Sequence, residues 1–433
     1  MSVTEVIKQA EQAIKVKQGG FLLLALMALM LILISVGNVS SSLANNQNIV
    51  FATSIFIIAS TYLNNRKARI SFPILICGSA VIAWMAASNG LAVYMGIEPA
   101  RWSRVFDLAV QIIALLTLIT ALRSRPEVTS WLMVGLLIAF AVNSTVLVYT
   151  WLTLENPQSY NWVWGLPNFV NIRFFASFMM VVACVSLWGS LVFSSKVRFL
   201  FYLILCLSLA QIFWSGSRSP LFSIVLASLI FGFLAGRTYL KRWLHILVLT
   251  VLAGLLAAQF PVDSNQLGVE RALGFGAKTI INTDNIDELS SGRLRIWKDA
   301  AEWIVQKPIL GWGGDYYREV SAASSVAQVH NGPLQIAIEW GIPLALLMYG
   351  ILLYIFIKCS VYLYANKNTP PIFTLGYFLF TSMLIHSLLD GVFYHGTMLF
   401  FMMVPLALLL STEPMAVTAS DHSNLNRSQD TDP

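Results

Sequence analysis

Apolar runs about 20 residues long recur along the whole chain, and this feature most narrows what it can fold into. A helix of that length crosses the hydrocarbon core of a bilayer with all its backbone groups bonded internally. Hydrophobic residues make up 57% of the 433 and charged residues 11%, against about a quarter charged in soluble domains. The mean hydropathy is +0.71. We therefore predict an all-α membrane protein with about a dozen transmembrane helices.

Twelve stretches fit this length and composition, with ends defined to within several residues. The predicted spans are 20–37, 49–63, 73–95, 106–122, 131–153, 169–193, 199–214, 219–236, 243–260, 332–357, 372–390 and 395–411.

The basic residues lie in short clusters between these spans, so the net charge of +6 indicates topology rather than nucleic-acid binding. With both ends inside, the inner segments collect most of the Lys and Arg residues, as the positive-inside rule requires. The inner clusters are Lys8, Lys15, Lys17, Arg66, Lys67, Arg69, Arg123, Arg125, Lys196, Arg198, Arg237, Lys241, Arg242, Lys358 and Lys367. The short outer loops carry only Arg101, Arg104, Arg173 and Arg218.

The spans divide the chain into five parts. Residues 1–19 form an interfacial amphipathic segment on the cytoplasmic side, and 20–260 hold helices one to nine. Residues 261–331 form a large outer loop, 332–411 hold helices ten to twelve, and 412–433 are a disordered cytoplasmic tail.

The outer loop contains a helical signal. Ser290-Ser291-Gly292 offers an N-cap, and an amphipathic stretch continues to Gln306 before Lys307-Pro308 ends it. Helical spacing places Arg293, Trp297, Ala300 and Ile304 on one face, which we expect to turn toward the membrane, and Arg295, Asp299 and Glu302 on a solvated one.

Two outer arginines are candidates for anion binding: Arg218, in the turn 215–219, and Arg293, in the loop. An arginine fork grips phosphate oxygens bidentately and keeps its charge at any physiological pH. The alternatives are a headgroup anchor for Arg218 and a salt bridge for Arg293.

His330 precedes a helix start with Asn331 as N-cap and Pro333 in the first turn. The positive end of that helix favours the neutral imidazole that a general base needs. A structural role is the alternative.

Three further residues, His386, Asp390 and His395, gather near the outer ends of the last two spans. They fit a polar support network better than a metal site, because their spacing matches no metal motif. Tyr160, Trp162 and Trp164 fit an interfacial aromatic belt or, alternatively, a surface that stacks on sugars.

The absence of certain motifs also narrows the function. The outer loop 38–49 contains no acidic residue, which argues against a metal-dependent glycosyl transfer of the kind that places paired acids there. The sequence has no P-loop and no dinucleotide fingerprint, so we expect no cofactor.

Over roughly residues 210–345 a series of short motifs resembles the shared core of the O-antigen ligase and O-antigen polymerase superfamily, which includes protein O-oligosaccharyltransferases. The motifs are Ser291-Gly292-Arg293 with Trp297, Pro308-Ile309-Leu310-Gly311-Trp312-Gly313, His330-Asn331, Leu334-Gln335 and Glu339-Trp340-Gly341-Ile342.

The resemblance implies an all-helical bundle in the bacterial inner membrane, with a large periplasmic loop between helices nine and ten. It also implies metal-free transfer of a glycan from a polyprenyl diphosphate carrier to an acceptor hydroxyl. Arg218 and Arg293 then contact the diphosphate and His330 is the base. The substrate-binding candidates are Arg295, Trp297, Asn331, His386, Asp390 and His395, although Arg295 can instead pair with Asp299.

The acceptor stays open: a lipid A core sugar for a ligase, a glycan repeat for a polymerase, or a protein hydroxyl for an oligosaccharyltransferase. The ligase is favoured by the single, moderately long loop. A transporter would require internal repeats or charged pairs at mid-membrane, and neither is evident. A non-enzymatic scaffold is the remaining alternative.

Overall fold

The computed structural model describes ten stretches of the chain: 72–97, 101–124, 128–169, 171–193, 195–235, 240–264, 266–274, 292–320, 328–366 and 368–412. The predicted spans 20–37 and 49–63, the interfacial segment 1–19 and nearly all of the tail lie outside these stretches.

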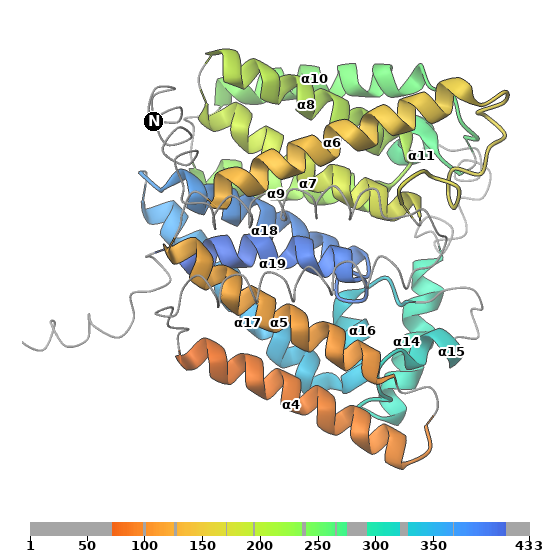
Figure 1. The fold of residues 1–433 in the computed structure, drawn as a ribbon, viewed down its shortest axis with the longest axis vertical. Coiled ribbons are helices and arrows are strands. Elements are labelled where there is room, and N and C mark those ends of the chain that lie inside the picture. Colours follow the sequence, from red (N-terminus) through yellow and green to blue (C-terminus); the bar gives the residue numbers. More distant parts are fainter. Residues whose placement is uncertain are drawn as a thin grey trace, which may run out of the picture.

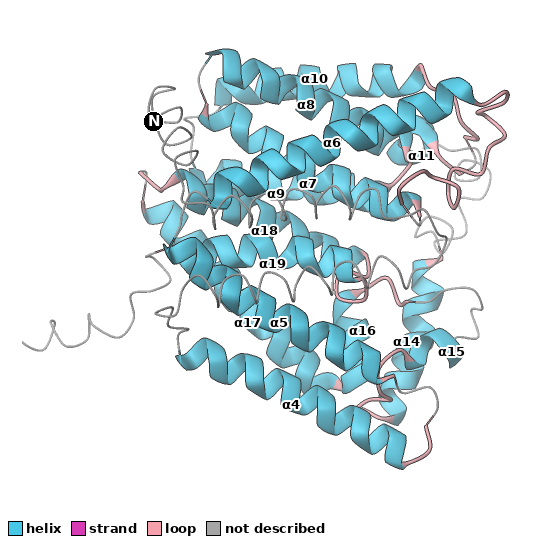
Figure 2. Cartoon of the chain, viewed as in Figure 1, coloured by secondary structure: helices cyan, strands magenta, loops and turns pink. Residues whose placement is uncertain are grey.

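Helices make up all the regular secondary structure in the described stretches (Figure 2). They are α4 (Phe72–Tyr94), α5 (Trp102–Ser124), α6 (Val128–Thr153), α7 (Ile172–Val192), α8 (Ser195–Trp214), α9 (Arg218–Ala235), α10 (Leu240–Ala258), α11 (Gly268–Leu273), α14 (Arg293–Gln306), α15 (Tyr316–Val320), α16 (Gly332–Trp340), α17 (Ile342–Ala365), α18 (Pro371–Leu389) and α19 (Gly396–Ser411).

Eight of the described helices, α4 to α9, α17 and α18, are long and apolar enough to cross a membrane. Two more apolar helices, His245–Ala258 within α10 and α19, are shorter. These ten overlap the ten predicted spans that fall on described residues, so the chain is a multi-pass membrane protein that is all-helical in the described stretches.

The long helices pack side by side, and contacts run in turn through α10, α8, α7, α18, α19, α5 and α4 (Figure 1). α7 packs between α8 and α18 in this series and is buried along nearly its whole length. Close packing of α7 on α8 depends on Gly189, where an added Cβ would lie 2.6 Å from the ring of Phe201. The short helices α11, α14 and α15 gather at one end of the bundle (Figure 1).

One predicted span is wrong in its continuity. The stretch 332–357 is divided into α16 and α17 at Gly341, whose φ is +87°. The chain before α16 explains the break: Ile342 N donates to Pro308 O at 2.8 Å, and Trp312 N donates to Ile338 O at 2.9 Å. A Cβ on Gly341 would lie 1.9 Å from Ile309 O, so only glycine permits this backbone contact.

The loop helix α14 begins and ends close to where the sequence predicted, but the assignment of its faces needs correction. Gly292, at φ +77°, precedes it without a side-chain cap. Ala300 and Ile304 are buried in the protein, where α14 contacts α16, rather than turned toward lipid. The interfacial belt prediction is wrong for Trp162, which is 1% exposed and packs edge-on against Trp214 at 5.2 Å.

Candidate active site

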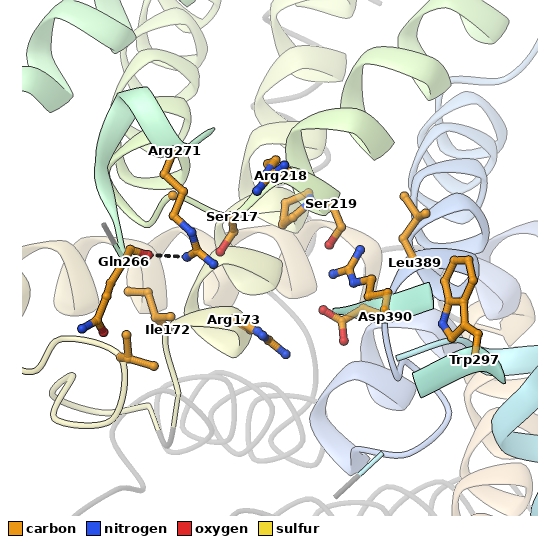
Figure 3. A pocket seen from close by; sticks show the side chains of 14 residues that line it. Ile172, Arg173, Ser217, Arg218, Ser219, Gln266, Arg271, Trp297, Leu389 and Asp390 are labelled. Carbon is orange, nitrogen blue, oxygen red and sulfur yellow. Dashed lines mark hydrogen bonds between the residues drawn. The ribbon is translucent and has the colours of Figure 1, made fainter. Parts of the chain in front are cut away.

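A cavity of about 440 Å³ opens at the end of the bundle where α11 and α14 lie (Figure 3). Its walls come from the start of α7, the turn into α9, α11, α14 and the end of α18. The lining residues are Val163, Ile172, Arg173, Gly216, Ser217, Arg218, Ser219, Pro220, Gln266, Arg271, Arg293, Trp297, Leu389 and Asp390. The cavity therefore brings together Arg218 and Arg293, which the sequence singled out from separate segments.

The turn before α9 shapes one side of this cavity. Gly216 has a φ of +64°, and a Cβ added there would lie 2.9 Å from the Cα of Leu267, the residue before α11. This close approach brings α11 against the turn, so that Arg271 faces the same cavity as Arg218. Arg271 also donates to the backbone carbonyl of Gln266, the contact drawn in Figure 3.

Among the described residues the lining is strongly cationic, because four arginines face the cavity against one aspartate. Burial lowers the pKa of Arg271, and the charges of Arg173, Arg218 and Arg293 lower it further. Burial also lowers the pKa of Arg293; Asp390 opposes this change, while Arg173 and Arg218 add to it. Arginine stays protonated despite such shifts, so the site concentrates like charges that a bound anion would neutralise.

His330 lies beside this cavity and is held from both sides of its ring. Nδ1 lies 2.9 Å from Asp390 Oδ1, and Nε2 lies 2.8 Å from Arg173 Nη1. A guanidinium only donates, so Nε2 must accept, and Nδ1 therefore carries the proton that Asp390 accepts. The geometry thus selects one neutral tautomer of His330.

The charges around His330 agree with this tautomer. Burial lowers the pKa of His330; its bond to Asp390 raises it in part, and Arg173 and Arg293 lower it again. Burial alone would raise the pKa of Asp390, but the hydrogen bond from His330 and the charge of Arg293 hold it well below its ordinary value. A neutral imidazole oriented by a carboxylate is the arrangement of a general base.

The backbone on either side of His330 is fixed by side-chain hydrogen bonds. Asn331 caps α16 as predicted, accepting from Leu334 N at 3.0 Å, and its amide donates to Leu388 O at 3.0 Å. Trp297 Nε1 donates to Val329 O at 3.1 Å. His330 itself adopts a φ of +53°, a conformation that this anchored segment stabilises.

The remaining predicted residues lie at different distances from the cavity. Trp297 and Asp390 line it, whereas Arg295 is exposed elsewhere on α14. His386 is buried behind it, 2.9 Å from Ser177 Oγ and 3.4 Å from the lining residue Ser219. His395 packs on Phe174 with ring centroids 4.3 Å apart.

Nowhere in the described stretches do three or more His, Cys, Asp or Glu side chains converge as a metal-binding group would. The charged groups that face the cavity are instead guanidinium groups and one carboxylate. These residues are suited to hold an anion directly.

Sequence reasoning missed two of the four cavity arginines. Arg173 had been counted only as a basic residue of a short outer loop, and Arg271 was not singled out. Each of the two could have been noted by its position on the outer side of the membrane. Arg173 lies in the first turn of α7, and Arg271 lies in the short helix α11 of the outer loop that also supplied Arg293.

The fold and the site define a class: a multi-pass membrane protein with an arginine-lined cavity beside a histidine–aspartate pair. Residues 201–349 match the family described as O-Antigen ligase, which confirms over this segment the resemblance to the O-antigen ligase superfamily. The matched segment contains Arg218, Arg271, Arg293 and His330, while Arg173 and Asp390 lie outside it. A search among curated proteins found no match.

Proposed function

We propose that this protein is an inverting, metal-independent glycosyltransferase of the bacterial inner membrane. It moves a glycan from a polyprenyl diphosphate carrier to an acceptor hydroxyl on the periplasmic face. The observation that carries the proposal is the convergence of four arginines with the His330–Asp390 pair at one cavity.

In the proposed reaction the acceptor oxygen attacks the anomeric carbon of the glycan, and the bond from that carbon to the diphosphate oxygen breaks. The acceptor proton passes to His330 Nε2, and Asp390 stabilises the resulting imidazolium. The bonding electrons leave with the diphosphate, which gains a negative charge.

The arginines favour this charge development over the ground state. Four arginines and one aspartate give the lining a formal charge of +3, which attracts the departing diphosphate more strongly than the intact donor. Removing one preorganised donor of this kind from an oxyanion site raises the activation free energy by about 3–4 kcal/mol. Guanidinium groups thus supply the charge that a divalent cation supplies in other transferases.

We propose lipid A core sugar as the acceptor, in keeping with the description of the matched family. A glycan repeat and a protein hydroxyl are acceptors for the same chemistry. The orientation, with both termini cytoplasmic and the loop 261–331 periplasmic, is the one that the distribution of basic residues favours.

The test uses purified full-length protein in lipid nanodiscs with a polyprenyl-diphosphate glycan, EDTA, and each of the three acceptor classes in turn. We expect transfer to lipid A core sugar, undiminished by EDTA and lost in Arg218→Met and His330→Asn. Lys298→Met, an exposed position on α14, is the matched control and keeps full activity. Transfer that requires added Mg²⁺, or that survives in His330→Asn, would overturn the mechanism.

A further inference from the structure

The nitrogen of His330 that a general base must use is already occupied. Nε2 accepts a hydrogen bond from Arg173 Nη1 at 2.8 Å, while Nδ1 is held by Asp390 at 2.9 Å. Nε2 has one lone pair in the plane of the ring, so it cannot serve Arg173 and an acceptor hydroxyl together. In this arrangement His330 cannot take a proton.

We propose that Arg173 is a latch on His330 that diphosphate binding releases. This inference rests on the proposed function, and it assigns to Arg173 a role separate from simple charge attraction. Arg173 lines the diphosphate cavity and also contacts the base. A diphosphate in the cavity draws its guanidinium away from Nε2, and the freed lone pair then accepts the proton of the sugar hydroxyl.

The backbone of Arg173 is fixed by hydrogen bonds, whereas its side chain is exposed and is held at its tip by His330. Asn171 accepts from Arg173 N at 2.8 Å, and Ile172 N donates to Val163 O at 3.0 Å. These bonds hold the first turn of α7 in place. The Arg173 side chain, by contrast, is exposed on the cavity wall, as Figure 3 shows.

Electrostatics favour the diphosphate over the imidazole as a partner for Arg173. The bond to a neutral ring is a charge–dipole contact, whereas the bond to a phosphate oxygen pairs opposite charges and is stronger and bidentate. Three other arginines face the same cavity, so in the empty cavity like charges repel the Arg173 guanidinium. A bound anion reverses that repulsion.

The latch imposes an order on the reaction. With the donor absent, His330 Nε2 is occupied by Arg173 and no acceptor hydroxyl is deprotonated. With the donor bound, the proton moves from the acceptor oxygen to Nε2 as that oxygen bonds to the anomeric carbon and the diphosphate leaves. Acceptor activation therefore follows donor binding.

The reactivity of His330 toward diethyl pyrocarbonate tests the latch directly, because this reagent acylates the unprotonated imidazole nitrogen. Full-length protein in nanodiscs is treated with and without inorganic pyrophosphate, and modification is mapped by mass spectrometry. We expect pyrophosphate to accelerate modification of His330 by roughly tenfold, about the change expected when one hydrogen bond to the nitrogen is removed. Exposed His245 and buried His386 provide internal references in the same sample.

Two variants separate a latch from a general effect of charge. Arg173→Met should make His330 reactive without pyrophosphate and remove the acceleration. Arg271→Met removes a charge from the same cavity without touching His330, so its His330 should react slowly until pyrophosphate is added. Protection of wild-type His330 by pyrophosphate, or no change, would overturn the latch.

The two proposals fail separately. If no acceptor is glycosylated but pyrophosphate still exposes His330, the latch stands and the glycosyl transfer does not. If glycan transfer depends on Arg293 and His330 while pyrophosphate shields His330, the transferase stands and the latch does not.

Discussion

Two polar clusters in the described part of this molecule are built on arginine, one lining an open cavity and one buried, and they differ in how their charge is balanced. In the cavity, four arginines face one aspartate. Near the C-terminal end of α16, Arg104 is 5% exposed and pairs with Glu339 at 3.2 Å. Glu339 in turn accepts from Gln335 at 2.9 Å and from Asp315 N at 3.2 Å. Among the described residues, the second cluster is balanced by its own carboxylate, whereas the first has an excess of positive charge that a bound anion would reduce.

The balanced cluster also supports the unbalanced one. Arg104 donates to Tyr394 O at 2.9 Å and to Phe393 O at 3.2 Å, in the loop that begins with Asp390. Glu339 lies on α16, whose N-cap Asn331 follows His330. Arg104 thus ties together the two segments that carry the histidine–aspartate pair. We expect the balanced cluster to govern stability and the unbalanced one to govern catalysis.

The largest expected effect on the catalytic side comes from His330→Asn, since asparagine tolerates the positive φ but is not a base. We expect the transfer rate to fall by about 10²–10⁴, the usual contribution of a general base. Farnesyl diphosphate affinity, measured by calorimetry, should not fall, because the arginines are intact and Arg173 no longer has His330 as a competing partner. An equal loss of affinity and rate would mean that His330 organises the cavity instead.

The balanced cluster is broken by Arg104→Met, which leaves Glu339 buried without its cation. We expect the free energy of unfolding to fall by about 3–5 kcal/mol, the cost of removing one partner of a buried pair. Chemical denaturation in detergent micelles measures this change. The double variant Arg104→Met/Glu339→Gln should recover much of this loss. A double variant no more stable than the single one would mean that the pair itself contributes little.

Arg293→Met should slow transfer by about 10²–10³, because one donor to the leaving oxygen is lost. Its effect on stability should have the opposite sign to that of Arg104→Met, since the remaining cavity arginines repel one another less. We expect an unchanged or higher unfolding temperature, measured by thermal denaturation. Lys298→Met on the same helix is the control for both measurements. A clear drop in unfolding temperature for Arg293→Met would mean that Arg293 is paired like Arg104.

The sequence predicts those features that depend on residues close together in the chain. Apolar runs located the long helices, and short motifs singled out Arg218, Arg293 and His330, because each lies next to a turn or cap that is visible in the sequence. The partners of His330 could not be read in this way, since Arg173 is 157 residues from it and Asp390 is 60 residues from it. Pairings over such separations are set by helix packing.

The break at Gly341 was missed for a different reason. Apolar residues predominate on both sides of Gly341, so a search by length and apolar content joins α16 to α17. The information lay in two glycine-containing motifs, 308–313 and 339–342, which fit against each other through backbone contacts. From the sequence alone, these motifs indicate a family, but they do not indicate that the two segments contact each other.

The smallest expected effect is a change in pH dependence. Burial, with Arg173 and Arg293, lowers the pKa of His330 below its ordinary value of 6.5, although Asp390 opposes this. The base is therefore neutral at pH 7, and activity should persist as the pH falls to 6.5. Below that, protonation removes the base, so kcat/KM should decline through the lowered pKa. A profile of kcat/KM between pH 4.5 and 8 measures this acidic limb.

Two substitutions should move the acidic limb in opposite directions. Arg293→Met removes a positive charge that lowers the pKa of His330, so the limb should move to higher pH. Asp390→Asn removes the group that raises it, so the limb should move to lower pH while the maximum rate also falls. A limb that stays in place in both variants would show that another group titrates. That result would leave the arginine cavity as the anion site but remove His330 as the base.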